Sequence, residues 1–158
     1  MAKLSDYLKK DLINLELQGT TKDEIICELA LMVKDKVSDF DKFLEAVYER
    51  ESAGSTALEH GLCIPHAKCK YVNEFCIAVG CKKEGVDCDS LDSKKSTVFF
   101  LIAGNDNTRL EHLGALVKIS QIVSDDTATE LLSNTKSREG FIDIIRKLEM
   151  RWQIFVIF

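Results

Sequence analysis

The chain has 158 residues, of which 46% are hydrophobic and 30% are charged, and its formal net charge is −5. These values fit a single globular domain over residues 1–158, which is long enough to bury a core without disulfides. The acidic balance argues against a nucleic-acid surface, which needs a basic footprint, and more weakly against binding to anionic membranes.

The amino terminus contains no export signal that we can identify. In MAKLSDYLKK, charged residues interrupt every apolar stretch, and no segment of the chain has the roughly 18 apolar residues that cross a bilayer. We therefore expect a cytoplasmic protein without membrane insertion, whose six cysteines are reduced thiols. None of these cysteines forms a C-x-x-C pair, so neither a zinc ribbon nor a thioredoxin-like motif is present.

The first half of the chain predicts two helices. Thr21 and Glu24 have the form of a capping box ahead of apolar residues at helical spacing, which predicts a helix over residues 22–35. Another apolar face predicts a helix from Ser38 to about Glu51. The small residues at 52–56 that follow predict a loop or an irregular strand.

The second half predicts strands and then helices. FCIAVGC (75–81) and TVFFLIA (97–103) predict buried strands, and the residues between them, including Glu84-Gly85, predict a turn or hairpin region. Helices are predicted from 107 to about 123, near 126–133 and near 138–149, the last capped by Ser137. With one or two strands near the amino end, this order predicts an α/β fold, a single-domain sandwich of a mixed β-sheet flanked by helices.

The chain ends in an apolar tail, residues 151–158, whose last five residues are IFVIF. We expect a final edge strand or a tail packed against the core. The alternative is an oligomer contact, because a free apolar edge favours association, and a homodimer is then conceivable.

The stretch EHGLCIPHAKCK (59–70) carries the polar side chains with the clearest chemistry. His60, Cys63, His66 and Cys69 recur at an interval of three and are zinc ligands by type. A strand would scatter them over both faces, and Pro65 opposes the helix that would align them. A Cys/His metal-binding protein, with the metal in an irregular loop, therefore stays as an alternative.

Two further interpretations of this stretch centre on His66. It could activate Cys63 or Cys69 as a thiol nucleophile, although buried cysteines often serve only as small hydrophobic residues. Alternatively, Pro65 holds His66 on a rigid backbone, and the upstream segment 50–56 supplies an arginine, two hydroxyls and a glycine. Those groups bind phosphate.

The spacing of these residues resembles the signature of a known family. The string R-E-x-x-G-S-T-x-x-x-x-G-x-x-I-P-H is similar to that of enzyme IIA of the fructose/mannitol class, a phosphocarrier of the bacterial phosphoenolpyruvate-dependent phosphotransferase system. The resemblance covers about residues 3–150 and is closer to the nitrogen-regulatory branch than to the mannitol branch. The string is filled by Arg50, Glu51, Gly54, Ser55, Thr56, Gly61, Ile64, Pro65 and His66.

The resemblance implies a histidine phosphocarrier with the fold of that enzyme IIA class. His66 would accept a phosphoryl group from the phosphorylated carrier HPr and pass it to an enzyme IIB domain or use it to signal to a regulatory target protein. Arg50 would neutralise the phosphoryl oxygens, His112 would hydrogen-bond the phosphate, and Ser55 and Thr56 would donate to it or cap a turn. No metal and no cofactor is implied.

The resemblance leaves several alternatives open. We expect a regulatory role rather than sugar transport, with transfer to enzyme IIB as the alternative, and whether such a carrier counts as an enzyme is undecided. Ala57-Leu58 stands where the family usually has a glycine-containing pair, and His60 replaces Asn or Glu. These departures keep a non-phosphorylated protein-binding module possible, and they place an unexplained titratable group, His60, beside the active segment.

Overall fold

The computed structural model describes the backbone of residues 2–157 and the side chains of residues 2–154. Single-turn helices join several of the longer elements: η1 (Leu4–Tyr7), η2 (Lys10–Leu12), η3 (Lys34–Lys36) and η4 (Asp106–Thr108). The strands are β1 (Ile13–Asn14), β2 (Leu62–Cys63), β3 (His66–Lys68), β4 (Cys76–Val86) and β5 (Ser96–Gly104). The α-helices are α1 (Lys22–Met32), α2 (Phe40–Ser52), α3 (Arg109–Ile122), α4 (Asp126–Ser133) and α5 (Arg138–Ile157).

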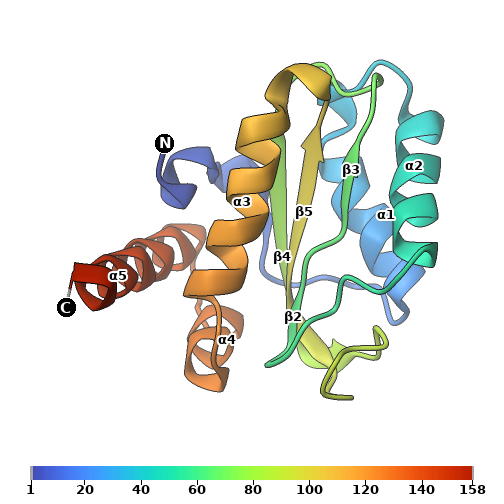
Figure 1. Cartoon of the computed structure of the whole chain (residues 1–158). Helices are drawn as coiled ribbons and strands as arrows, with labels where there is room; N and C mark the ends of the chain where they lie inside the picture. Colours follow the sequence, from blue (N-terminus) through green and yellow to red (C-terminus); the bar gives the residue numbers. More distant parts are fainter. Residues whose placement is uncertain (1, 158) are drawn as a thin grey trace.

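The strands form one mixed sheet in the order β1-β4-β5-β2, and β3 also pairs with β5. The long strands β4 and β5 are antiparallel, whereas β1 runs parallel to β4, and β2 and β3 run parallel to β5. Helices α1 and α2 cover one face, and α3, α4 and α5 cover the other (Figure 1). The predicted α/β sandwich with a mixed sheet is confirmed.

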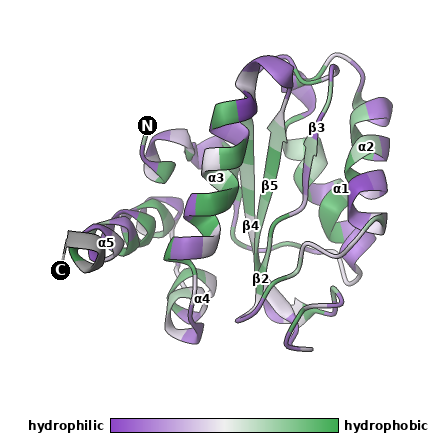
Figure 2. Ribbon diagram, in the orientation of Figure 1, coloured by the Kyte–Doolittle hydropathy of each residue, from purple (hydrophilic) through white to green (hydrophobic). Residues whose placement is uncertain are grey.

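The two faces of the sheet bury two apolar clusters. On β5, Val98, Phe100 and Ile102 pack toward α3, α4 and α5, while Phe99 and Leu101 pack toward α1 and α2. Because successive side chains of a strand point to opposite faces, a strand covered on both sides must be apolar at every position. Figure 2 shows β4 and β5 as hydrophobic strands between helices whose outer faces are hydrophilic. Each fully buried Phe or Leu contributes about 1.5–3 kcal/mol.

Side-chain caps start the helices close to the predicted positions. The Thr21 hydroxyl accepts from the Glu24 N–H, and Asp39, one residue after the expected Ser38, caps α2. Ser137 accepts from the Gly140 N–H, as its predicted capping role requires. Each cap satisfies a backbone donor that the first turn leaves unpaired, which stabilises the helix by about 1 kcal/mol.

Two local predictions were right only in part. The predicted hairpin region between the strands is present, because β4 and β5 are antiparallel and residues 87–95 connect them. Glu84-Gly85, however, lies at a register shift within β4, where Gly85 takes a positive φ of 77° that permits the bulge. Of the two expectations for the tail, the edge strand is wrong, since α5 continues to Ile157, whereas packing against the core is found at Trp152. Leu148 packs in the core, and Trp152, four residues later, packs against the same cluster, so the helix continues along the core. The side chains of residues 155–158 lie outside the described residues.

Among the described helices, none combines the length and the apolar character needed to cross a membrane.

Candidate functional site

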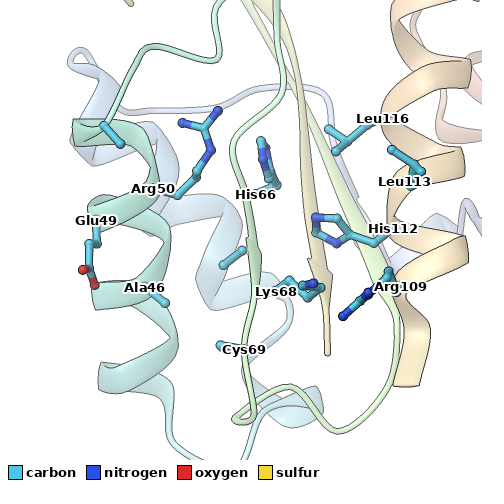
Figure 3. A pocket seen from close by; sticks show the side chains of 12 residues that line it. Ala46, Glu49, Arg50, His66, Lys68, Cys69, Arg109, His112, Leu113 and Leu116 are labelled. Carbon is cyan, nitrogen blue, oxygen red and sulfur yellow. The ribbon is translucent and has the colours of Figure 1, made fainter. Parts of the chain in front are cut away.

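A depression lies between α2 and α3, along the strand β3 (Figure 3). It has a volume of about 760 Å³. Arg50 reaches toward it from α2, His112 faces it from α3, and His66 stands between them on β3 (Figure 3). The other lining residues are Ala46, Glu49, Ala53, Ala67, Lys68, Cys69, Arg109, Leu113 and Leu116. The structure thus brings together three of the five residues that the sequence predicted for a phosphate site.

Two hydrogen bonds to backbone carbonyls hold His66 in place, one from β5 to the residue before it and one from its own ring. The Pro65 carbonyl accepts from the Ile102 N–H at 3.0 Å, which fixes the strand immediately before the histidine. The His66 Nδ1 lies 2.9 Å from the Ile64 carbonyl oxygen. A carbonyl can only accept, so this contact assigns the ring proton of the neutral imidazole to Nδ1 and leaves a lone pair on Nε2. The lone pair of the neutral His66 ring therefore lies on Nε2.

The surroundings of His66 favour its neutral form. Desolvation by burial lowers the pKa of His66 below its ordinary value of 6.5, and the Arg50 charge lowers it further. The hydrogen bond to the Ile64 carbonyl and the charge of Glu51 act in the opposite direction but do not prevail. The reactive lone pair is consequently free at neutral pH.

His112 is the second histidine of the depression. Its ring centroid lies 5.5 Å from that of His66, and the side chain is buried at 7% exposure. Burial, together with the nearby His66 and Lys68, lowers the pKa of His112 to about 4. Its Nδ1 has no hydrogen-bond partner among the described residues and lies over Gly104, where an added Cβ would come within 3.0 Å of this nitrogen. His112 is thus a neutral ring beside His66.

Arg50 lies in the last turn of α2 with its side chain exposed. Its Nη1 donates to the Gly54 carbonyl at 2.9 Å. A guanidinium has five N–H donors, so this single bond orients the group and leaves donors for an anion in the depression.

Ser55 and Thr56 do not line the depression. The Ser55 hydroxyl donates to the Cys88 carbonyl at 2.6 Å, and the buried Thr56 donates both its N–H and its hydroxyl to the Glu51 carboxylate. In this conformation both hydroxyl protons are already engaged within the protein, so of the two roles that the sequence allowed, the geometry favours the structural one.

Lys68 and Arg109 line the depression and were not predicted from the sequence. Lys68 lies two residues after His66 on β3, so the period-2 spacing of a strand puts both side chains on one face. Arg109 precedes His112 by about one turn of α3. Strand and helix periodicity around the two histidines was the signal that could have identified them. Together with Arg50, they give the rim a positive charge.

The metal and thiol alternatives gain no support from the geometry. Among the residues with described side chains, no three His, Cys, Asp or Glu side chains are grouped so as to hold a metal ion. Cys63 is fully buried, and its hydrogen bond with Cys88, with burial, raises the pKa of the Cys63 thiol, which opposes formation of a nucleophilic thiolate. Cys69 does line the depression but is partly buried.

His60 is not part of the depression, contrary to the expectation that it lies beside the active residues. Its Nδ1 is 3.0 Å from an Asp126 carboxylate oxygen at the start of α4, and its N–H donates to Asp92. His60 and Gly61 have φ values of 65° and 81°, and the Leu62 N–H donates to the Glu59 carbonyl, so these residues form a tight type I′ turn before β2.

The chain was compared with known proteins. It is 33% identical to the fructose-specific EIIABC component of the phosphotransferase system of Bacillus subtilis, over 92% of this chain and 23% of that protein. The chain thus spans less than a quarter of that relative. The crystal structure of the nitrogen regulatory protein IIA-Ntr from Neisseria meningitidis matches with a TM-score of 0.83 and 26% identity, over 90% of this chain and 98% of that one.

A third similarity concerns the fold alone. Enzyme IIAMtl of Escherichia coli, solved in complex with phosphorylated enzyme IIBMtl, matches with a TM-score of 0.77 and 19% identity, over 89% of this chain and 97% of that one. The family described as "Phosphoenolpyruvate-dependent sugar phosphotransferase system, EIIA 2" matches residues 6–148. The chain therefore belongs to the EIIA 2 family of the phosphoenolpyruvate-dependent sugar phosphotransferase system.

Proposed function

We propose that this chain is a histidine phosphocarrier that accepts a phosphoryl group on Nε2 of His66 from the phosphorylated histidine of an HPr-type carrier. The observation that carries the proposal is the contact between His66 Nδ1 and the Ile64 carbonyl, which leaves Nε2 as the nucleophilic nitrogen of a neutral ring. The positions of Arg50 and His112 on either side of His66 support it (Figure 3).

The proposed transfer is a displacement at phosphorus. The Nε2 lone pair of His66 forms the new N–P bond while the N–P bond to the donor imidazole breaks, and that imidazole takes back its electron pair. Because such transfers depend mainly on position and charge, the protein's task is to align the ring and to neutralise the equatorial oxygens. Arg50 supplies charge-assisted hydrogen bonds, and His112 adds a polar ring next to the same oxygens.

Two recipients are supported by separate observations. A IIB domain of a sugar-transport system is supported by the 33% identity to a fructose-specific component and by the complex of the E. coli mannitol protein with phosphorylated IIB. A regulatory target is supported by the similarity to IIA-Ntr and by the Gly54-Ser55-Thr56 sequence. Incubating the phosphorylated chain with a fructose-type IIB domain separates them, since rapid loss of the phosphoryl group favours transport and its retention favours regulation.

Phosphorylation itself can be tested directly. The chain is incubated with phosphoenolpyruvate, enzyme I and HPr, and its intact mass is followed. We expect one added phosphoryl group that is labile in acid and stable in base, absent in His66→Ala and retained in the matched control His60→Ala. A chain that stays unlabelled while a known enzyme IIA is labelled would contradict the proposal and favour a binding module that is not phosphorylated.

A further inference from the structure

Glu51 is a buried carboxylate with two hydrogen-bond donors and one ion-pair partner, although it does not line the depression. Its side chain is 6% exposed. One oxygen accepts from the Thr56 N–H and the other from the Thr56 hydroxyl, and Lys22 Nζ lies 3.6 Å away. A buried carboxylate is costly unless it is paired and hydrogen-bonded, so this arrangement is a specific one.

The hydrogen bonds of Glu51 continue along the backbone to the nucleophile. Thr56, which Glu51 holds, accepts at its carbonyl from the Ile64 N–H at 3.1 Å. The other end of the same residue, the Ile64 carbonyl, accepts from His66 Nδ1 at 2.9 Å. Glu51, Thr56, Ile64 and His66 therefore form one continuous path that ends at the ring nitrogen whose proton decides the tautomer.

Glu51 also acts on the other side of the depression. It follows Arg50 directly in the last turn of α2, and that helix end leads into the loop whose Gly54 carbonyl accepts from the Arg50 guanidinium. One carboxylate thus fixes the end of α2, the loop after it and, through Thr56, the peptide at Ile64. The spacing between arginine and histidine depends on all three.

We propose that Glu51 is a positioning residue of the phosphoryl site, which acts through Thr56 to hold the Ile64 carbonyl against His66 Nδ1 and to fix Arg50 relative to that ring. This inference rests on the proposed phosphoryl transfer, but it concerns the tautomer and the position of the ring, which can be measured without any phosphate. It also gives Thr56 a task different from binding the phosphoryl group.

The test uses Glu51→Gln, Thr56→Val and Thr56→Ser in the full chain. The matched control is Ser52→Ala, because the Ser52 hydroxyl lies on the same helix end and donates only to the Glu49 carbonyl. The tautomer is read from the ¹⁵N NMR shifts of the imidazoles above pH 8, where the chain's three histidines can be assigned from single variants. The rate is the single-turnover acceptance of a phosphoryl group from phospho-HPr.

We expect Glu51→Gln and Thr56→Val to mix the His66 tautomers and to lower the acceptance rate by about 10- to 100-fold, as loss of an outer hydrogen-bond partner does. Thr56→Ser should restore both readouts, and Ser52→Ala should change neither. Glu51→Gln and Thr56→Val proteins that are folded by circular dichroism and have the wild-type tautomer and rate would overturn the inference. If Glu51→Gln does not fold, Thr56→Val alone decides.

The two proposals fail in different ways. If the wild-type chain accepts no phosphoryl group, the proposed function is wrong, while the tautomer measurement still decides whether Glu51 orients His66. If the wild-type chain is phosphorylated but the variants keep its rate and tautomer, only the positioning role of Glu51 is wrong.

Discussion

His60 and His66 belong to the same short segment, yet the two ends of that segment give them different chemistry. His66 is half-buried, its partner is a backbone carbonyl, and a guanidinium stands nearby. His60 lies on a tight turn, and its partner is an exposed carboxylate of Asp126 that Lys94 also contacts. The first environment disfavours a charged ring, and the second is a surface contact of a kind that contributes little to stability.

The comparison shows that neighbours in space decide what a histidine can do. A carbonyl fixes a tautomer without adding charge, and burial disfavours the imidazolium, so both act together on His66. His60 instead contacts a carboxylate at the protein surface. The predictions below test whether this difference, rather than the residue type, separates the two ends of the segment.

The largest expected effect is that of removing the Arg50 charge. Arg50→Ala should slow phosphoryl acceptance about 100-fold, the usual loss when one donor to a developing anion is removed. Arg50→Lys should recover part of the rate because it keeps the charge but loses the planar fork. Single-turnover transfer from phospho-HPr measures both, with Arg146→Ala as control, since Arg146 pairs with Asp143 on α5. An unchanged rate in Arg50→Ala would contradict the idea that the Arg50 charge separates the His66 end of the segment from the His60 end.

The pH dependence should differ between the histidines of the depression and a free imidazole. Because the pKa of His66 lies below 6.5 and that of His112 at about 4, both rings are neutral at pH 7. The acceptance rate should therefore stay flat above pH 6.5 and fall about tenfold per pH unit below the pKa of His66, as its lone pair is protonated. NMR titration of the three histidines checks the assignment.

Arg50→Ala sharpens this test. The Arg50 charge is one cause of the lowered pKa of His66, so its removal should move the midpoint of the His66 titration to higher pH. A midpoint that stays in place, or one that moves to lower pH, would contradict the arrangement described for the depression.

The smallest effect is expected at the turn that carries His60. Gly61 has a φ of 81°, and an added Cβ would meet Thr97 Oγ1 at 3.0 Å. Gly61→Ala should lower the free energy of unfolding in urea by about 1–2 kcal/mol, the cost of a left-handed L-residue, and should leave phosphoryl acceptance unchanged. His60→Asn is the control, because Asn-Gly suits a type I′ turn. A loss of acceptance in folded Gly61→Ala would mean that the turn and the site are coupled.

Much of the fold could be predicted from local patterns. Helix caps at Thr21 and Ser137 and the apolar runs on β4 and β5 located the elements, because the interactions that define them join residues close in sequence. The helical form of the tail was not predicted, because its five last residues are all apolar and show neither a strand nor a helix period.

The candidate site was predictable in part. Pro65 and the arginine of the upstream segment pointed to His66 as the residue that takes up phosphate, which remains a prediction. Residue spacing could pair Lys68 with His66 and Arg109 with His112, but the meeting of these two pairs depends on how β3 faces α3, which no residue spacing contains. The same holds for Thr56, whose hydroxyl could be assigned to Glu51 only when the loop after α2 was known.

Gly104, at the end of β5, matters for any attempt to build this pair of histidines into another protein. The ring of His112 rests on position 104 because nothing larger than a hydrogen atom is there. The distance between the two imidazoles is therefore set by a missing side chain as much as by the residues present. A designer who grafts the two histidines onto another sheet must copy this gap as well, or the second ring will be pushed away from the first.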